Sequence, residues 1–235
     1  MSTREVHRLT CPGCGETWEE ALFRGLRIGR LPEVREAILQ RRFEIFRCPA
    51  CFAAVQAHGT PLVFTDFQHF QYIGVEGRGL GDVEAALLRH RVAFDRSFVF
   101  GPEAAESLGR QLVPRLVFGL GCLREKLIIA DGGLDDRVVE AVKGDLQRSR
   151  GWSHREQQLR VEEVLDGGHL LLARMPALPR STSGDVYVGA PTPVLGWEMV
   201  TAQQVARRAA RREEIGDDYP WLGTEWLVDL HITAL

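Results

Sequence analysis

The sequence has no strong excess of either charge, because 29 basic and 32 acidic residues leave a formal net charge of -3. A chain of this charge has no overall basic field that would draw it to nucleic acid or to anionic lipid. The sequence also has no apolar run long enough to span a bilayer, and its first residues are polar where a secretory signal would be apolar. We therefore expect a cytoplasmic protein that does not enter a membrane.

Motifs that mark common catalytic centres are missing as well. The 7 histidines include no helical pair at i and i+4, and no His-Glu-x-x-His occurs. Neither a Gly-x-Ser-x-Gly turn nor a phosphate loop is present, and the glycines of residues 77–81 fit a plain turn better than a dinucleotide fingerprint. The sequence thus indicates no catalytic residue. An active site assembled from scattered residues would leave no motif, so an uncharacterised enzyme stays among the alternatives.

Cysteine is scarce, but its placement is informative. Four of the 5 cysteines form two Cys-x-x-Cys pairs, Cys11 with Cys14 and Cys48 with Cys51. Each pair offers a metal ion two thiolates from one tight turn, and two pairs complete the tetrahedral shell of a structural zinc. Such a shell leaves no position for water or substrate, so the zinc would hold the fold together and would not catalyse. A rubredoxin-like iron site is one alternative, and two disulfides, which a reducing cytosol disfavours, are another.

The residues around these pairs differ from one pair to the other. Gly15 follows the first pair and allows a positive φ, whereas Phe52 follows the second, where a positive φ is costly. The second turn must therefore differ from the first or carry strain.

His7 and His58 are close enough in sequence to be replacement ligands, although each fits a strand residue better. Cys122 adjoins an apolar helix face and is expected to be a buried, inert thiol.

Local patterns predict an α+β fold. Strands are expected on either side of both cysteine turns, with a helix from Pro32 to about Arg42 inserted between them. The 33 residues between Cys14 and Cys48 exceed the usual spacing of a zinc ribbon, and this helix accounts for the excess. Beyond the second turn, the patterns predict strands at 61–67 and 70–75 and helices at 83–92, 103–112, 120–128 and 135–146.

The C-terminal third has its own local signals. Residues 149–158 are polar and indicate a linker, and Asp166-Gly167-Gly168 predicts a hairpin of strands 159–165 and 169–175. Thr201 and Gln204 form a capping box for a helix that extends to about Ile215, and residues 227–235 alternate like a half-buried strand. We therefore predict two parts. The first is a domain at residues 1–148, in which zinc-ribbon-like knuckles with a helical insert are followed by a mixed sheet and helices. The second is a smaller C-terminal α/β segment at 158–235.

Two charged groups in these helices have both a structural and a functional interpretation. Asp135 and Asp136 could be paired catalytic carboxylates, but adjacent residues at a helix start point apart, which favours capping. A basic cluster could follow a phosphate backbone, although Glu213 and Glu214 interrupt it. The cluster consists of Arg207, Arg208, Arg211 and Arg212.

Four segments together resemble the CpXC family of bacteria and archaea, which is named for its two Cys-Pro-x-Cys motifs. The segments are Thr10-Cys11-Pro12-Gly13-Cys14-Gly15, Arg47-Cys48-Pro49-Ala50-Cys51, Pro61-Leu62-Val63-Phe64-Thr65-Asp66, and a stretch from Arg115-Leu116-Val117-Phe118-Gly119 through Leu123-Arg124-Glu125-Lys126-Leu127 to Gly133-Leu134-Asp135-Asp136. The likeness spans most of residues 1–147, and the sequence departs from the family pattern after Cys51, where Phe52 stands in place of a glycine. The family has no established biochemical activity, so the resemblance implies a zinc-ribbon-like module and nothing about residues 150–235.

The sequence therefore predicts a non-catalytic, zinc-stabilised interaction or adaptor module of a bacterial cytoplasmic complex. Tyr219, Trp221 and Trp226, followed by the strand at 227–235, are expected to dock a protein partner or a second copy of the chain. The competing interpretations are a zinc-ribbon regulator that binds nucleic acid and the uncharacterised enzyme. The sequence identifies neither the partner nor the oligomeric state.

Overall fold

The computed structural model of the chain describes residues 2–58, 61–77, 83–153, 156–177, 187–188, 193–223 and 226. Its contacts divide the chain into two compact units. Unit 1 comprises Met1–Leu120 with Pro179–Ala190, and unit 2 comprises Gly121–Leu178 with Pro191–Leu235. The division predicted from sequence, 1–148 and 158–235, stays a prediction.

Unit 1 is built on a mixed five-stranded sheet, in the order β1-β2-β5-β6-β7. Its strands are β1 (Thr3–Thr10), β2 (Thr17–Arg27), β5 (Leu62–Asp66), β6 (Gln71–Glu76) and β7 (Val113–Phe118). The β1–β2 and β5–β6 pairs are antiparallel, whereas the β2–β5 and β6–β7 pairs are parallel. The predicted strand at 17–23 is longer than expected because Gly25–Arg27 pair with β5. One long strand thus connects the first cysteine turn to the sheet.

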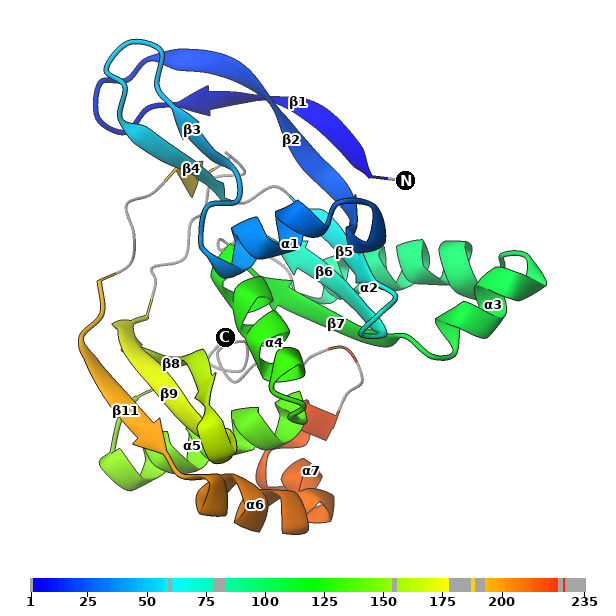
Figure 1. The fold of residues 1–235 in the computed structure, drawn as a ribbon, viewed down its shortest axis with the longest axis vertical. Helices are drawn as coiled ribbons and strands as arrows, with labels where there is room; N and C mark the ends of the chain where they lie inside the picture. Colours follow the sequence, from blue (N-terminus) through cyan, green and yellow to red (C-terminus); the bar gives the residue numbers. More distant parts are fainter. Residues whose placement is uncertain are drawn as a thin grey trace. The chain divides into compact units, whose positions relative to one another are not determined.

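A second, three-stranded sheet carries the second cysteine turn. It has the order β10-β4-β3 and consists of β3 (Ile45–Arg47), β4 (Ala54–His58) and the short β10 (Tyr187–Val188). The predicted helical insert is present as α1 (Pro32–Leu39), with Pro32 in its first turn. It ends before Arg41, which has a φ of 59°, and so is shorter than predicted. Figure 1 shows the β1–β2 and β3–β4 hairpins converging at their turns.

Two helices and an unpredicted strand complete unit 1. The helices are α2 (Val83–Phe94), extended by a π-helical turn at Asp95–Val99, and α3 (Glu103–Gly109). The sequence predicted no strand after the helix at 103–112, but Pro114 lies in β7, opposite Tyr72 of β6. Because β7 is the last strand in the order of the sheet, a residue without an N–H costs little there. Asp82, the residue expected to cap the predicted helix at 83–92, lies outside the described residues.

Unit 2 packs helices against an antiparallel sheet of order β11-β9-β8. The strands are β8 (Gln157–Leu165), β9 (His169–Pro176) and β11 (Gly196–Val200), and the helices are α4 (Leu120–Asp131), α5 (Asp136–Arg150), α6 (Ala202–Ala210) and α7 (Ile215–Asp218). The hairpin predicted at Asp166-Gly167-Gly168 is confirmed, and both glycines have positive φ. The core joins side chains from the sheet to side chains from all four helices, among them Leu172, Ile129, Val139, Val205 and Ile215.

Several predicted boundaries in unit 2 were wrong. The polar linker expected at 149–158 is shorter, because α5 runs to Arg150 and stops where Gly151 adopts a φ of 68°. The capping box at Thr201 and Gln204 is confirmed, but α6 ends at Ala210 and the chain continues through a 3-10 turn into α7. Strand β11 was not predicted. The terminal strand expected at 227–235 lies outside the described residues.

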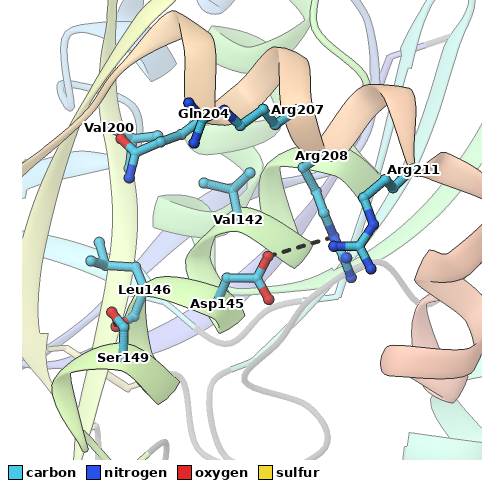
Figure 2. A pocket seen from close by; sticks show the side chains of 9 residues that line it. All are labelled: Val142, Asp145, Leu146, Ser149, Val200, Gln204, Arg207, Arg208 and Arg211. Carbon is cyan, nitrogen blue, oxygen red and sulfur yellow. Dashed lines mark hydrogen bonds and ion pairs between the residues drawn. The ribbon is translucent and has the colours of Figure 1, made fainter.

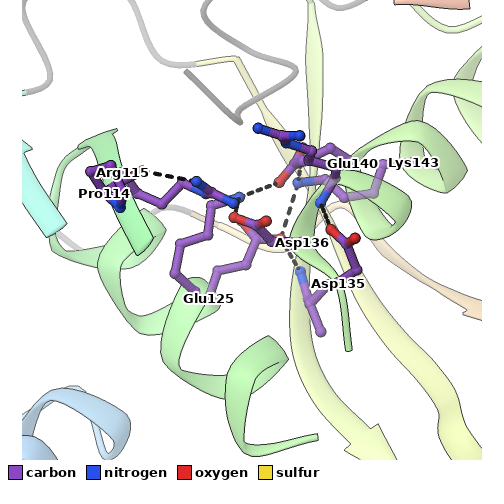
Figure 3. Close-up of polar contacts among 10 residues, drawn as sticks. Pro114, Arg115, Glu125, Asp135, Asp136, Glu140 and Lys143 are labelled. Carbon is purple, nitrogen blue, oxygen red and sulfur yellow. Dashed lines mark hydrogen bonds and ion pairs between the residues drawn. The ribbon is translucent and has the colours of Figure 1, made fainter. Parts of the chain in front are cut away.

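A cluster of charged side chains lies inside unit 2, between α4 and α5 (Figure 3). Lys143 is fully buried, and its Nζ lies 3.0 Å from Glu125 Oε1 and 2.8 Å from Glu140 Oε2. Lys126 Nζ lies 3.2 Å from Glu140 Oε1 and 3.5 Å from Asp136 Oδ2. Burial raises the pKa of Glu125, although the charge of Lys143 opposes this shift. The helix pair is thus held by ion pairs from which water is largely excluded.

Candidate metal centre

The two hairpin turns bring the four predicted cysteine ligands together. The Sγ atoms of Cys11 and Cys51 are 3.6 Å apart, as are those of Cys14 and Cys48. All four sulfurs lie within 4.8 Å of one another. Each of the two short distances joins a cysteine of one turn to a cysteine of the other. The cluster therefore requires both hairpins, although their sequences are 33 residues apart.

The two turns have the same backbone structure. In the first, Gly15 N–H donates to Cys11 O at 2.9 Å and Cys11 N–H donates to Glu16 O at 2.8 Å. In the second, Phe52 N–H donates to Cys48 O at 3.0 Å and Cys48 N–H donates to Ala53 O at 3.0 Å. Gly15 has a φ of 77° and Phe52 a φ of 61°. Of the two possibilities that the sequence left open, strain at Phe52 is the one realised.

The first cysteine of each turn is inside the protein and the second is at the surface. Cys11 is 1% exposed and Cys48 is completely buried, packed with Val55 and Trp18, whereas Cys14 and Cys51 are exposed. The cluster therefore lies at the edge of a small apolar core. A metal ion held there would join both turns to that core.

The thiols differ in their tendency to ionise. The backbone N–H groups of Cys14 and Gly13 lower the pKa of Cys11 to about 7, which favours its thiolate. The N–H of Glu16 acts in the same direction on Cys14, but its neighbouring thiols and burial outweigh this contribution and raise its pKa to about 12. Four thiolates cannot coexist at this spacing without a cation, so metal binding would release protons from the cluster.

The two short sulfur–sulfur distances are compatible with a tetrahedral ion. Zinc–sulfur bonds of about 2.3 Å arranged as a tetrahedron place the sulfurs about 3.8 Å apart, close to the observed 3.6 Å. The same distances are much longer than the roughly 2.05 Å of a disulfide, and all four residues are free cysteines. The donor set could hold a metal ion with Cys11, Cys14, Cys48 and Cys51, and it would leave that ion no open coordination position.

The structure also places the other residues that the sequence singled out. His7 lies in β1 with its Nε2 3.8 Å from Glu5 Oε2, and it is not part of the cysteine cluster. Cys122 is 6% exposed, as predicted for a buried thiol. Asp135 caps α5 by accepting a hydrogen bond from Arg137 N–H at 2.9 Å, while Asp136 pairs with Lys126. The two adjacent carboxylates therefore have separate partners, as expected for capping.

Sequence reasoning missed two histidine–carboxylate pairs in unit 1. Asp66 is almost completely buried and lies 2.8 Å from His69 Nδ1, and His90 Nε2 lies 3.0 Å from Glu76 Oε1. Burial alone would raise the pKa of Glu76, but hydrogen bonds from His90 and Arg89 outweigh it and lower the pKa. The Glu76 pair had no sequence signal, because its partners are 14 residues apart.

A family model described as CpXC protein matches residues 9–143 of the chain. This match covers more than half of the sequence and includes both cysteine pairs. The chain belongs to the CpXC family. Comparisons with curated proteins and with solved structures returned no match.

The family region of this CpXC protein covers more than the cysteine turns. It begins near the end of β1, includes the other four strands of the five-stranded sheet and α4, and ends within α5, at Lys143 of the buried ionic cluster. Strands β8, β9 and β11 and helix α6 follow after its end. In the described part of the chain, no helix has both the length and the apolar character needed to cross a bilayer.

Proposed function

We propose that this CpXC protein is a non-catalytic interaction module stabilised by one structural zinc ion. The observation that supports the proposal most directly is the convergence of four cysteine sulfurs within 4.8 Å of one another. A metal with four thiolate ligands has no free position to bind water or polarise a substrate, so it acts by cross-linking the chain. Its ligands would be Cys11, Cys14, Cys48 and Cys51.

The cellular part of the proposal is a role as an adaptor in a bacterial cytoplasmic complex, with a protein partner or a second copy of the chain. Reduced cysteines with a metal suit the reducing cytoplasm, where disulfides are disfavoured. Exposed apolar side chains in β11 support a binding role, since Trp197 is 57% and Met199 60% exposed. Large apolar side chains at a protein surface commonly mark contact sites.

Metal content and partner recovery together test this proposal. Protein purified without added metal should contain one zinc per chain by elemental analysis, and stoichiometric iron would replace zinc with the rubredoxin-like alternative. The tagged full chain, isolated from its native host, should co-purify with a protein in fixed stoichiometry or as an oligomer. A chain recovered as a monomer without partners would contradict the interaction role.

Cysteine variants test the structural role of the metal. Cys48→Ser removes a buried ligand, so it should lower the melting temperature and make it insensitive to chelator. Cys122→Ser is the matched control, because it changes a buried cysteine that lies outside the cluster. It should keep the wild-type response to chelator, although a buried hydroxyl could cost about 1–3 kcal/mol of stability. Equal loss of the chelator response in both variants would contradict the assignment.

Nucleic-acid binding is the second candidate function, and the arginine cluster is the feature that favours it. Most of its charge already has a carboxylate partner in the structure. Arg208 pairs with Asp145 and Asp218, Arg211 pairs with Glu214, and Arg212 pairs with Asp135. We therefore expect the ultraviolet absorbance of the purified protein to show no bound nucleic acid, and we expect the protein to bind duplex DNA weakly. Tight binding would favour the nucleic-acid regulator instead, if the logarithm of the binding constant fell with the logarithm of the salt concentration by about 0.9 per phosphate contact.

A further inference from the structure

A groove lies between helices α5 and α6 of unit 2, where strand β11 ends (Figure 2). It has a volume of about 280 Å³. Helix α5 contributes Val142, Asp145, Leu146 and Ser149. Helix α6 contributes Gln204, Arg207 and Arg208, followed by Arg211 just past its end, and Val200 lies at the end of the strand. The volume suits one or two large side chains better than a folded domain or a large cofactor.

The two walls of the groove differ in chemistry. On α5 the lining positions follow the spacing i, i+3, i+4 and i+7, and on α6 they follow i, i+3 and i+4, so each set is a stripe along one helix face, which Arg211 extends at the C-cap of α6. The α5 stripe, together with Val200, supplies three apolar side chains. The α6 stripe supplies three arginines and an amide. An occupant that matches both walls must therefore carry an apolar group beside negative charge.

The arginines differ in how strongly they are already engaged. Arg208 is 6% exposed, and its guanidinium lies 2.6 Å from Asp218 Oδ2 and 3.6 Å from Asp145 Oδ2, which holds it in place. Arg211 is exposed and pairs with Glu214, three residues further along the chain. Arg207 is exposed and has no hydrogen bond or ion pair to any residue that the structure describes. Arg207 therefore offers a cation to an incoming ligand without breaking an existing ion pair.

The single carboxylate in the groove is already well compensated. Asp145 accepts a hydrogen bond from Tyr219 Oη at 2.9 Å and pairs with Arg148 Nη2 at 3.0 Å as well as with Arg208. The Gln204 side-chain oxygen is used by the capping box, where it accepts from Thr201 N–H at 2.8 Å. Its NH₂ group has no partner in the described part of the chain. Both the charge and the free donors of the groove thus favour an acceptor-rich, anionic ligand.

We propose that the α5–α6 groove binds an acidic peptide segment of a partner protein. In the complex, one large apolar side chain of that segment packs on the half-buried Leu146, at the edge of the core that contains Val142 and Val200. Its flanking Asp or Glu carboxylates pair with Arg207 and accept hydrogen bonds from Gln204. This assignment rests on the proposed interaction function and specifies the surface and the chemistry of the partner.

A peptide fits the groove better than a phosphate backbone does. The apolar wall makes no favourable contact with a phosphate. Burial of a Leu, Ile, Met or Phe side chain against it contributes roughly 25 cal/mol of binding free energy per Å² of apolar surface removed from water. The carboxylates of Asp145, Asp218 and Glu214 lie beside the arginines and oppose a dense row of phosphates. A peptide has only a few charges at wider spacing, so it can meet the arginines and avoid these carboxylates.

Selection from a phage library of random 12-residue peptides, panned on the full chain as purified, tests the groove directly. We expect enrichment of peptides in which two or more acidic residues flank a large apolar residue. A synthetic peptide of the leading sequence should then bind at least fivefold more weakly to Arg207→Ala. It should bind at least tenfold more weakly to Ser149→Trp, which fills the groove from the exposed end of α5 without changing any charge.

Arg212→Ala is the matched control, because it removes the same charge from an arginine that pairs with Asp135 and does not line the groove. Peptide affinity should stay within twofold in this variant. Enrichment without acidic residues, or binding unaffected by both Arg207→Ala and Ser149→Trp, would overturn the proposal. It would also be overturned if a 20-nucleotide single-stranded DNA bound the wild-type chain and lost its binding in the same two variants.

The groove and the interaction role can fail separately. If a native partner co-purifies equally with wild type and with both groove variants, the interaction function stands and the groove assignment is wrong. If the acidic peptides bind the groove but the native chain is recovered without any partner, the peptide assignment holds and the adaptor role is wrong.

Discussion

Replacement of Lys143 by methionine is expected to destabilise the protein severely, because it removes a buried cation that serves two carboxylates. Lys143 is fully buried, and its Nζ lies within 3.0 Å of Glu125 and Glu140. Methionine has a similar length, so the change removes charge with little change in volume. Loss of one partner from a buried ion pair costs about 3–5 kcal/mol, against a total stability of roughly 5–15 kcal/mol for a typical protein.

The pH dependence of this loss separates the electrostatic cause from a packing defect. Burial already raises the pKa of Glu125, and removal of Lys143 should raise it further. A raised pKa means that the folded state binds the proton more tightly than the unfolded state does. The stability contributed by that proton is present at low pH and is lost as the pH rises through the folded-state pKa. The cost of Lys143→Met should therefore be smaller at pH 5 than at pH 8.

Urea denaturation followed by circular dichroism measures these differences, and a melting experiment should show a drop of roughly 6–20 °C at pH 8. Val139→Ala is the matched packing control in the same helix, and its cost should not depend on pH. The double variant Lys143→Met with Glu125→Gln should recover most of the loss, because the glutamine oxygen can still accept the hydrogen bond from Val161 N–H. A loss below about 1 kcal/mol, or an equal loss at both pH values, would refute the reasoning.

Three further variants test local features of the fold. Phe52→Gly should raise the stability by about 1 kcal/mol in urea denaturation, because it relieves a positive φ that Gly15 adopts freely, and unchanged or lower stability would argue against strain. Burial raises the pKa of Glu44 to about 7, so wild-type stability should fall as the pH rises from about 4.5 past 7. Glu44→Gln should remove this dependence and be the more stable protein at pH 8, and parallel pH profiles would contradict it. Gly144→Ala should lower the melting temperature although alanine favours helices, because its Cβ would lie 2.5 Å from Tyr219 Oη; a higher melting temperature would show that the ring moves aside at little cost.

Features that depend on a few neighbouring residues followed directly from the sequence. Each Cys-x-x-Cys turn, the Asp-Gly-Gly hairpin and the capping box at Thr201 act over four residues or fewer, so their geometry is fixed by local backbone preferences. The convergence of both cysteine pairs also followed, because a tetrahedral metal requires four ligands. The family resemblance had the same origin, in short motifs kept in order, and the family match confirmed it.

Tertiary structure decided the features that join distant residues. Sheet pairing placed Pro114 in an edge strand and extended β2 to meet β5, since parallel partners leave no local mark on either strand. Helix packing buried Lys143 against Glu125 of another helix, where isolated periodicity indicated only apolar contacts. The α5–α6 groove likewise combines side chains from one face of α5 with side chains from one face of α6, about 60 residues apart in the sequence. Local spacing shows which side chains share a face of one helix, but only the packed fold determines what that face meets.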